Sequence, residues 1–213
     1  PVATIAVIGP AADDPRLAEG DYHYPAHLEI IYPNEPSGDT RSGGSGTSLL
    51  PQAGGAFAPG PYFPDIITPL SGIRTLLEQH RANAAADGAD NSGGAVEVLH
   101  APGCGVTDQH GDDDAITEAV EAAATAELAV VCLAGRSGLT PDATVGEARD
   151  ASSLDLTGRQ LELLEQVTST GVPTVAVLCS GRVHTLAEVE RLANATLLAW
   201  VPGIEGGTAI AQI

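Results

Sequence analysis

Residues 127–158 read ELAVVCLAGRSGLTPDATVGEARDASSLDLTG, and this stretch decides the fold. It opens with residues 128–133, a run of apolar and β-branched side chains without polar alternation. Such a run is typical of a parallel strand that helices cover on both faces. A loop of about twenty residues follows, and loops of that length inside a compact domain are usually functional or disordered. The loop carries a carboxylate, Glu147, between Gly146 and Ala148.

Four further apolar runs have the same character as the first one. They alternate with segments of helical periodicity, and this alternation predicts right-handed βαβ units and an open, mostly parallel sheet. Helices are expected on both faces of the sheet, as in an α/β sandwich, and ligands are expected at the carboxyl ends of the strands. The further strands are predicted at 2–8, 96–99, 174–178 and 196–201, and the helices from Thr68 as N-cap, over 115–126, from Asp155 or Thr157 to Gly171, over 185–192 and from Glu205 onward.

Residues 11–67 interrupt this alternation with a long irregular insertion after the first strand. The insertion is rich in Gly and Pro and carries most of the aromatic side chains, which is typical of a lid over a surface. Asp21, Tyr22 and His23 lie within it and are candidates for lining a polar pocket that binds substrate, with ordinary packing as the alternative. Arg136 and Ser137, directly after the central strand, are two further substrate-binding candidates.

The composition excludes several classes of partner. The net charge is −19, with 28 acidic residues against 9 basic ones, all of them Arg. Such a surface repels nucleic acid and anionic membranes. Adaptation to high salt and a GC-rich genome are equally good explanations of this composition. Hydrophobic residues make up 43% of the chain and cluster in periodic segments, so the chain is not a disordered one. No apolar run has the length of a membrane-spanning helix, and the cellular location is left open.

The residues give no signature of a cofactor or a metal site. Residues 9–14, GPAADD, stand where a dinucleotide-binding domain has its glycine-rich turn, and residues 41–48, RSGGSGTS, lack the Lys of a phosphate loop. No GxSxG elbow follows a strand. Cys104, Cys132 and Cys179 are too far apart in sequence for a metal-ligand pair, and the last two are predicted to be buried in strands. We therefore predict no cofactor.

An acidic cluster precedes the helix predicted at 115–126. Asp108, His110 and residues 112–114 offer oxygen and nitrogen ligands for a cation. The favoured interpretation is that these acids complement the positive end of the helix dipole. The histidines at 80, 100 and 184 have no partner in the sequence and are predicted to be surface or core residues.

An ordered set of motifs resembles the C-terminal α/β sandwich domain of glycoside hydrolase family 3, whose members include β-glucosidases and β-xylosidases. The resemblance covers almost the whole chain, so residues 1–213 are predicted to be one such domain. In order, the motifs are VIGPAADDPR, GDYHYP, TPLSGIR, APGCGV, VGEARDASSLDLTGRQLELLEQV, VPTVAVLCSGR and LLAWVPGIEGGTAI.

The resemblance implies a role for Glu147. This residue stands at the Glu of the family pattern SGEGxD, which supplies the general acid/base of a retaining, exo-acting β-glycosidase. Val145 replaces the Ser and Ala148 the second Gly of that pattern, and Thr157 stands where the family has Pro. The substitution at 148 limits the backbone path beside the carboxylate.

The resemblance also implies a partner and a substrate. The nucleophilic Asp of the family lies on a preceding TIM barrel that no part of this chain resembles. We therefore expect a piece of a longer enzyme that acts on β-linked glucosides or xylosides, and we expect the piece alone to be inactive. The alternatives are a non-catalytic carbohydrate-binding or scaffold module and an unrelated nucleotide-binding α/β domain.

Overall fold

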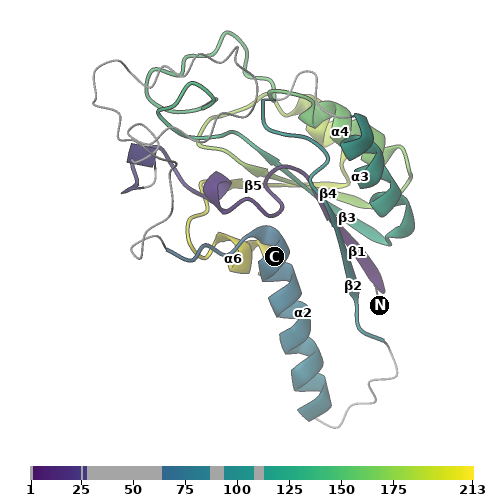
Figure 1. Cartoon of the computed structure of the whole chain (residues 1–213). Helices are drawn as coiled ribbons and strands as arrows, with labels where there is room; N and C mark the ends of the chain where they lie inside the picture. Colours follow the sequence, from purple (N-terminus) through teal and green to yellow (C-terminus); the bar gives the residue numbers. More distant parts are fainter. Residues whose placement is uncertain (1, 25, 28–63, 87–93, 108–112) are drawn as a thin grey trace.

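A computed structural model of the chain describes residues 2–24, 26–27, 64–86, 94–107 and 113–213. Within these residues one sheet of five strands runs in the order β2-β1-β3-β4-β5, with every neighbouring pair parallel. Figure 1 shows the sheet at the centre of the molecule. The strands are β1 (Thr4–Ile8), β2 (Glu97–Ala101), β3 (Leu128–Ala134), β4 (Thr174–Cys179) and β5 (Ala195–Trp200). The predicted open parallel sheet is confirmed, with each strand within two residues of its predicted bounds.

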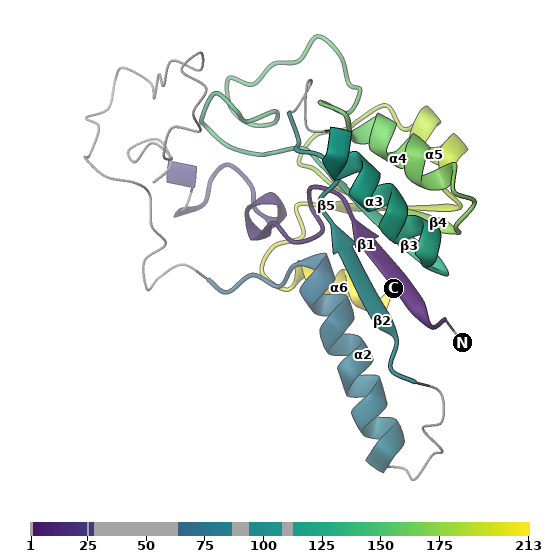
Figure 2. The ribbon, with the colours of Figure 1, turned by 45° about the vertical axis from the view of Figure 1, so that its right-hand side comes forward.

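Helices cover both faces of the sheet, as the sequence predicts. Helices α3, α4 and α5 lie side by side on one face, and α2 and α6 lie on the other (Figure 1, Figure 2). No helix in the described part of the chain is both long and apolar enough to cross a membrane. The helices are α2 (Pro69–Ala86), α3 (Asp113–Thr125), α4 (Gln160–Thr168), α5 (Ala187–Leu192) and α6 (Gly206–Gln212), preceded by a short 3-10 helix, η1 (Pro15–Ala18).

The two faces of the sheet bury separate apolar clusters. The cluster under α3, α4 and α5 contains Ile8, Ile116 and Leu164, all of them nearly inaccessible to solvent. The cluster under α2 and α6 contains Cys132 and Cys179, as predicted, and burial raises the pKa of both thiols, that of Cys179 to about 12. Since the thiolate is the reactive form, these cysteines act as small apolar side chains.

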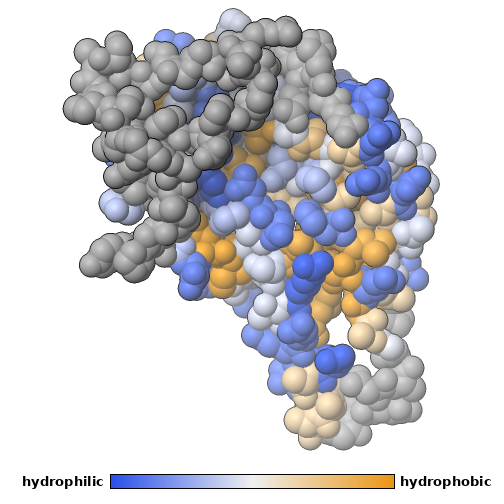
Figure 3. Space-filling view, viewed as in Figure 1, coloured by the Kyte–Doolittle hydropathy of each residue, from blue (hydrophilic) through white to orange (hydrophobic). Residues whose placement is uncertain are grey.

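The face under α2 and α6 is covered less completely than the other one. Strand residues Ile5, Val98, Val130 and Val175 belong to its apolar cluster but are only partly buried. Figure 3 shows apolar surface beside α2 on this side of the molecule. Helix α6 is seven residues long and covers only part of the sheet.

The first part of the segment predicted as an irregular insertion belongs to the core. Ala11, Ala12 and Leu17 pack under α2 and α6, because η1 folds back against this face of the sheet. Residues 28–63 of the insertion, including RSGGSGTS, lie outside the described residues. The Gly and Pro content of residues 11–67 predicts an irregular segment throughout. The start of this segment instead packs into the apolar core.

The observed start of a helix agrees with the predicted one where a capping residue is present. It differs where a left-handed glycine or a tertiary contact keeps the preceding residues out of the helix. The amide of Ser71 donates to Thr68 Oγ1 at 3.2 Å, so Thr68 caps α2 as predicted. Helix α4 was predicted to begin at Asp155 or Thr157, but it begins at Gln160. Gly158 has a left-handed φ of 65°, and the Thr157 hydroxyl donates to the carbonyl of Val106 at 2.6 Å. Both features keep this segment out of the helix.

The acidic cluster before α3 is described from Asp113 onward, and Asp108, His110 and Asp112 lie outside the described residues. Asp113 and Asp114 occupy the first turn of α3, which agrees with the interpretation as helix-dipole partners. Asp113 also forms an ion pair with Arg159 at 2.7 Å. Of the three histidines predicted to be surface or core residues, His80 and His100 are exposed and His184 is buried.

Candidate functional site

The direction in which the chain crosses the sheet reverses between β1 and β3. The chain leaves β1 toward β2 on one side, and it leaves β3 toward β4 on the other side. In parallel α/β sheets, such a reversal of direction leaves a ligand site at the carboxyl ends of the two strands. The loop after β1 carries Asp21 and Tyr22, and the loop after β3 carries Glu147. The topology therefore brings the predicted site residues to one point of the sheet edge.

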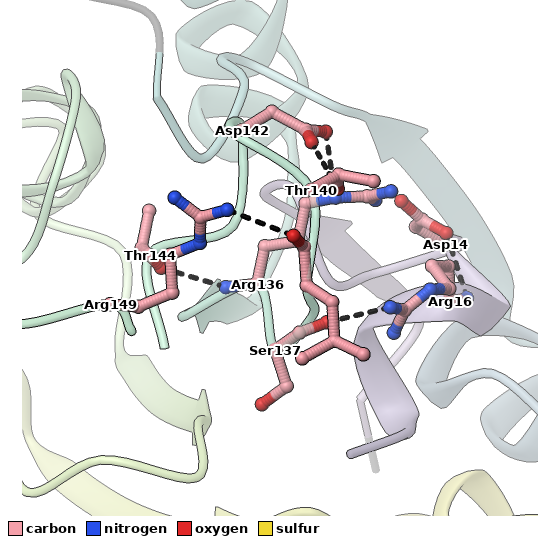
Figure 4. Close-up of polar contacts among 9 residues, drawn as sticks. Asp14, Arg16, Arg136, Ser137, Thr140, Asp142, Thr144 and Arg149 are labelled. Carbon is pink, nitrogen blue, oxygen red and sulfur yellow. Dashed lines mark hydrogen bonds and ion pairs between the residues drawn. The ribbon is translucent and has the colours of Figure 1, made fainter. Parts of the chain in front are cut away.

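The loop after β3, residues 135–159, begins by folding back on itself. The amides of Thr144 and Val145 donate to the carbonyl of Arg136 at 2.9 and 3.1 Å, and the Arg136 amide donates to Thr144 Oγ1 at 3.0 Å. The amide of Gly138 donates to the carbonyl of Val145 at 3.0 Å. Figure 4 shows this compact turn. Gly146 and Glu147 follow it directly in the chain. The loop is thus ordered by its own backbone.

Arginine side chains hold the backbone of this loop from several directions. Arg16, which is buried in η1, donates to the carbonyl of Ser137 at 2.7 Å, and Arg149 donates to the carbonyl of Leu139 at 2.9 Å (Figure 4). Arg182, after β4, donates to the carbonyl of Arg149. Arg16 and Arg182 thus tie the loop to elements outside it, whereas Arg149 joins two parts of the loop itself. These roles of Arg16 and Arg182 are not predicted from the sequence.

An ion pair closes the turn. Arg136 Nε lies 2.9 Å from Asp142 Oδ2, and the Thr140 hydroxyl donates to Asp142 Oδ1 at 2.5 Å (Figure 4). Burial of the Asp142 carboxyl would raise its pKa. The hydrogen bond from Thr140 and the positive charge of Arg136 outweigh burial, so the pKa of Asp142 lies below its ordinary value. Asp142 therefore stays ionised and keeps Arg136 in place.

The base of the loop is closed by a buried amide. The Gln160 side chain is fully buried; its Oε1 accepts from the Ala134 amide at 2.7 Å, and its Nε2 donates to the Ala134 carbonyl at 2.9 Å. Nε2 also lies 3.1 Å from the carbonyl of Thr157. The end of β3 and the start of α4 are thereby joined across 26 residues. A polar residue in the buried stripe of a helix is the sequence signal that could have revealed this role.

Glu147 is exposed and is held by two neighbouring residues of the loop after β1. The Tyr22 hydroxyl donates to Glu147 Oε2 at 2.5 Å, and the Glu147 amide donates to Asp21 Oδ2 at 3.2 Å. The hydrogen bond to Glu147, partial desolvation and the negative charges of Glu147 and Asp21 all raise the pKa of Tyr22. The tyrosine is therefore a neutral hydrogen-bond donor throughout the physiological pH range.

The backbone on both sides of Glu147 follows a left-handed path. Gly146 has a φ of 129°, and a Cβ at this position would lie 2.7 Å from the carbonyl oxygen of Gly138. Ala148 has a φ of 55°, a conformation that costs an L-residue about 1–2 kcal/mol. The sequence predicts that Ala148 limits the backbone path at this point. The turn is kept in this chain, and Ala148 adopts a strained backbone conformation in it.

Replacement of Ala148 tests this backbone strain. Ala148→Gly is expected to raise the free energy of unfolding by about 0.5 kcal/mol, because glycine relieves the strain but adds freedom to the unfolded chain. Ala148→Val is expected to lower it by about 1 kcal/mol or more, because a β-branched residue tolerates a positive φ poorly. Denaturant unfolding of the three proteins measures both changes. A valine variant as stable as the glycine variant would contradict the left-handed conformation.

The remaining predicted site residues engage other groups. His23 Nδ1 accepts from the Ala26 amide at 3.0 Å, and its Nε2 lies 3.0 Å from Glu19 Oε2. Arg136 is committed to Asp142, and Ser137 is 3% exposed. The structure thus brings Asp21 and Tyr22 into contact with Glu147, whereas His23 anchors the segment that carries them. No group of three or more His, Cys, Asp or Glu side chains in the described ranges has the arrangement of a metal site.

Comparison with known proteins identifies the family. The model of the glycosyl hydrolase family 3 C-terminal domain matches residues 1–213. The chain belongs to glycosyl hydrolase family 3. It is 26% identical over 212 residues to a β-xylosidase of Formosa agariphila, a match that covers 100% of this chain and 22% of that protein. It is 29% identical over 165 residues to a periplasmic β-glucosidase of Salmonella typhimurium, covering 69% of this chain and 19% of that protein.

Solved structures of family 3 enzymes share the fold. A family 3 exo-β-xylosidase in complex with a xylobiose aziridine probe superposes with a TM-score of 0.62 at 22% identity, over 100% of this chain and 20% of that one. A β-glucosidase from Listeria innocua in complex with isofagomine gives 0.60 at 19% identity, over 99% and 21%. The chain therefore spans about a fifth of the length of the family 3 proteins that it matches.

Proposed function

We propose that this chain is the part of a retaining, exo-acting β-glycosidase that supplies the general acid/base, Glu147. The observation that carries the proposal is the position of this exposed carboxylate at the carboxyl ends of β1 and β3, where Tyr22 binds its side chain and Asp21 its backbone amide. Family membership supports a hydrolase, and the β-xylosidases and β-glucosidases among the relatives favour β-linked xylosides or glucosides as substrates.

The proposed reaction has two steps with opposite roles for Glu147. In the first, the carboxylic acid of Glu147 protonates the glycosidic oxygen while a second carboxylate attacks the anomeric carbon and forms a glycosyl-enzyme. In the second, the Glu147 carboxylate takes a proton from water, whose oxygen attacks the anomeric carbon and releases the sugar. The two carboxyl groups of a retaining enzyme stand about 5–5.5 Å apart.

The second carboxylate is proposed to lie on a TIM-barrel domain of the same protein. Glu147 is exposed and Tyr22 is 71% exposed, so the described residues at this edge of the sheet do not enclose a sugar. Sites for small molecules bury most of the ligand surface, which requires a second surface over Glu147. The predicted substrate contacts of Asp21, Tyr22, His23, Arg136 and Ser137 remain predictions within this two-domain site.

Activity in the presence and absence of a barrel tests the proposal. The 213-residue chain alone is expected to release no nitrophenol from aryl β-glucosides or β-xylosides. The same chain joined to a family 3 barrel is expected to release it, and replacement of the barrel nucleophile should abolish the release. Hydrolysis by the chain alone would contradict the two-domain site. A folded, joined protein that lacks glycosidase activity would favour a non-catalytic scaffold module.

A further inference from the structure

We propose that Tyr22 is a positioning residue for the proton transfer by Glu147. Its hydroxyl occupies Glu147 Oε2, which leaves Oε1 as the oxygen that gives the proton to the glycosidic oxygen and later takes one from water. The inference rests on the proposed function of Glu147 and adds to it a specific oxygen and a specific partner. The contact joins residues 125 positions apart, so it is a product of the fold.

Tyr22 is carried on a segment that is anchored on both sides. Glu19, which is buried, lies 3.0 Å from His23 across one turn, and the Ala26 amide donates to the ring of His23. The neighbouring Asp21 accepts the hydrogen bond from the Glu147 amide. One short turn thus contacts both the backbone and the side chain of Glu147. Tyr22 thereby holds one carboxyl oxygen of Glu147, while Asp21 holds the backbone that carries it.

The chemistry of the pair selects one carboxyl oxygen. A neutral tyrosine donates to Oε2 when Glu147 is ionised, and it can keep donating when Glu147 is protonated on Oε1. Both steps of the reaction therefore proceed with the same carboxyl orientation. A free carboxyl group would instead share its proton between two oxygens and several rotamers, which reduces the fraction of productive encounters.

Two charged side chains lie next to the pair along the chain, and each of them contacts a backbone group. Asp21 lies on the same side as Tyr22 and directs Oδ2 to the Glu147 amide. Arg149, two residues beyond Glu147, directs its guanidinium to the carbonyl of Leu139. Among the described residues, the Tyr22 hydroxyl is thus the side-chain group that donates to the Glu147 carboxylate.

The test is Tyr22→Phe in the complete enzyme. We expect kcat on alkyl β-glycosides to fall about tenfold, because a hydrogen bond to a charged group is lost. Dinitrophenyl glycosides need little protonation and should lose less than about threefold in the first step. KM is expected to change little.

Tyr24→Phe is the matched control. Tyr24 is 54% exposed two residues along the same segment, and its replacement should leave kcat, the leaving-group dependence and the pH profile unchanged. Both variants should unfold within about 1 °C of the wild type, because both hydroxyls are at the surface.

Two outcomes would overturn the inference. The first is a Tyr22→Phe enzyme with wild-type kcat on alkyl glycosides and a wild-type leaving-group dependence. The second is an equal loss on all leaving groups with a raised KM, which would make Tyr22 a substrate contact. In either case, inactivity of a Glu147 variant on alkyl glycosides would leave the proposed function intact. An active Glu147 variant would instead remove the proposed function itself, whatever Tyr22→Phe does.

Discussion

In the complete enzyme, Glu147→Gln is expected to lower kcat on alkyl β-glycosides by about 10²–10⁴-fold, the usual contribution of general acid/base catalysis. Glutamine keeps the size of the side chain and can still accept the hydrogen bond from Tyr22. It cannot donate a proton to the leaving oxygen. The loss should therefore be largest for poor leaving groups and smaller for dinitrophenyl glycosides. Steady-state kinetics on a series of leaving groups measure this dependence.

Azide distinguishes a lost acid/base from a damaged fold. In Glu147→Ala, the removed side chain leaves space beside the glycosyl-enzyme, and azide needs no general base to attack the anomeric carbon. We expect azide to restore part of the activity on activated substrates and to yield the glycosyl azide with retained configuration. A wild-type enzyme should give little of this product.

Asp150→Asn is the control on the same loop. Asp150 is an exposed carboxylate three residues from Glu147, so its replacement removes the same charge from the same surface. Its activity should stay within about twofold of the wild type, as expected for a surface substitution away from the reacting atoms. If Glu147→Gln kept full activity on alkyl glycosides, Glu147 would not be the acid/base.

The second large effect is expected for stability. Gln160→Leu removes the amide that binds the N–H and C=O of Ala134 and the carbonyl of Thr157, all at the base of the loop. A buried polar group without a partner costs about 1–3 kcal/mol. We expect the free energy of unfolding to fall by about 3 kcal/mol and the melting temperature by about 10 °C.

Gln166→Leu on the same helix is the control. It makes the same change of residue type without removing a buried hydrogen bond. Gln166 is exposed and donates only to Glu162 among its described contacts, at 3.1 Å. Its replacement should change the free energy of unfolding by less than about 0.5 kcal/mol. Equal stability of the two variants in denaturant unfolding would show that the Gln160 side chain does not stabilise the base of the loop.

The sequence predicts the strands well because a strand depends on a local property, the run of apolar side chains along its own residues. A run such as residues 128–133 is apolar on both faces, and in the structure β3 is packed on one side against α3 and α4 and on the other against the α2 and α6 layer. Thr68 is likewise identified correctly as a cap, because the capping contact reaches only three residues along the chain. The start of α4 was predicted too early, since a contact with Val106 competes with the local signal.

The sequence by itself determined the alternation of strands and helices, the parallel sheet and the family, because these follow from local periodicity and from motifs in a fixed order. Only the tertiary structure decided which side chains meet. The contact of Tyr22 with Glu147 and that of Arg16 with Ser137 join residues more than 120 positions apart. Their physical origin is the strand order, which places the loops after β1 and β3 at the same edge of the sheet although they are distant in the chain.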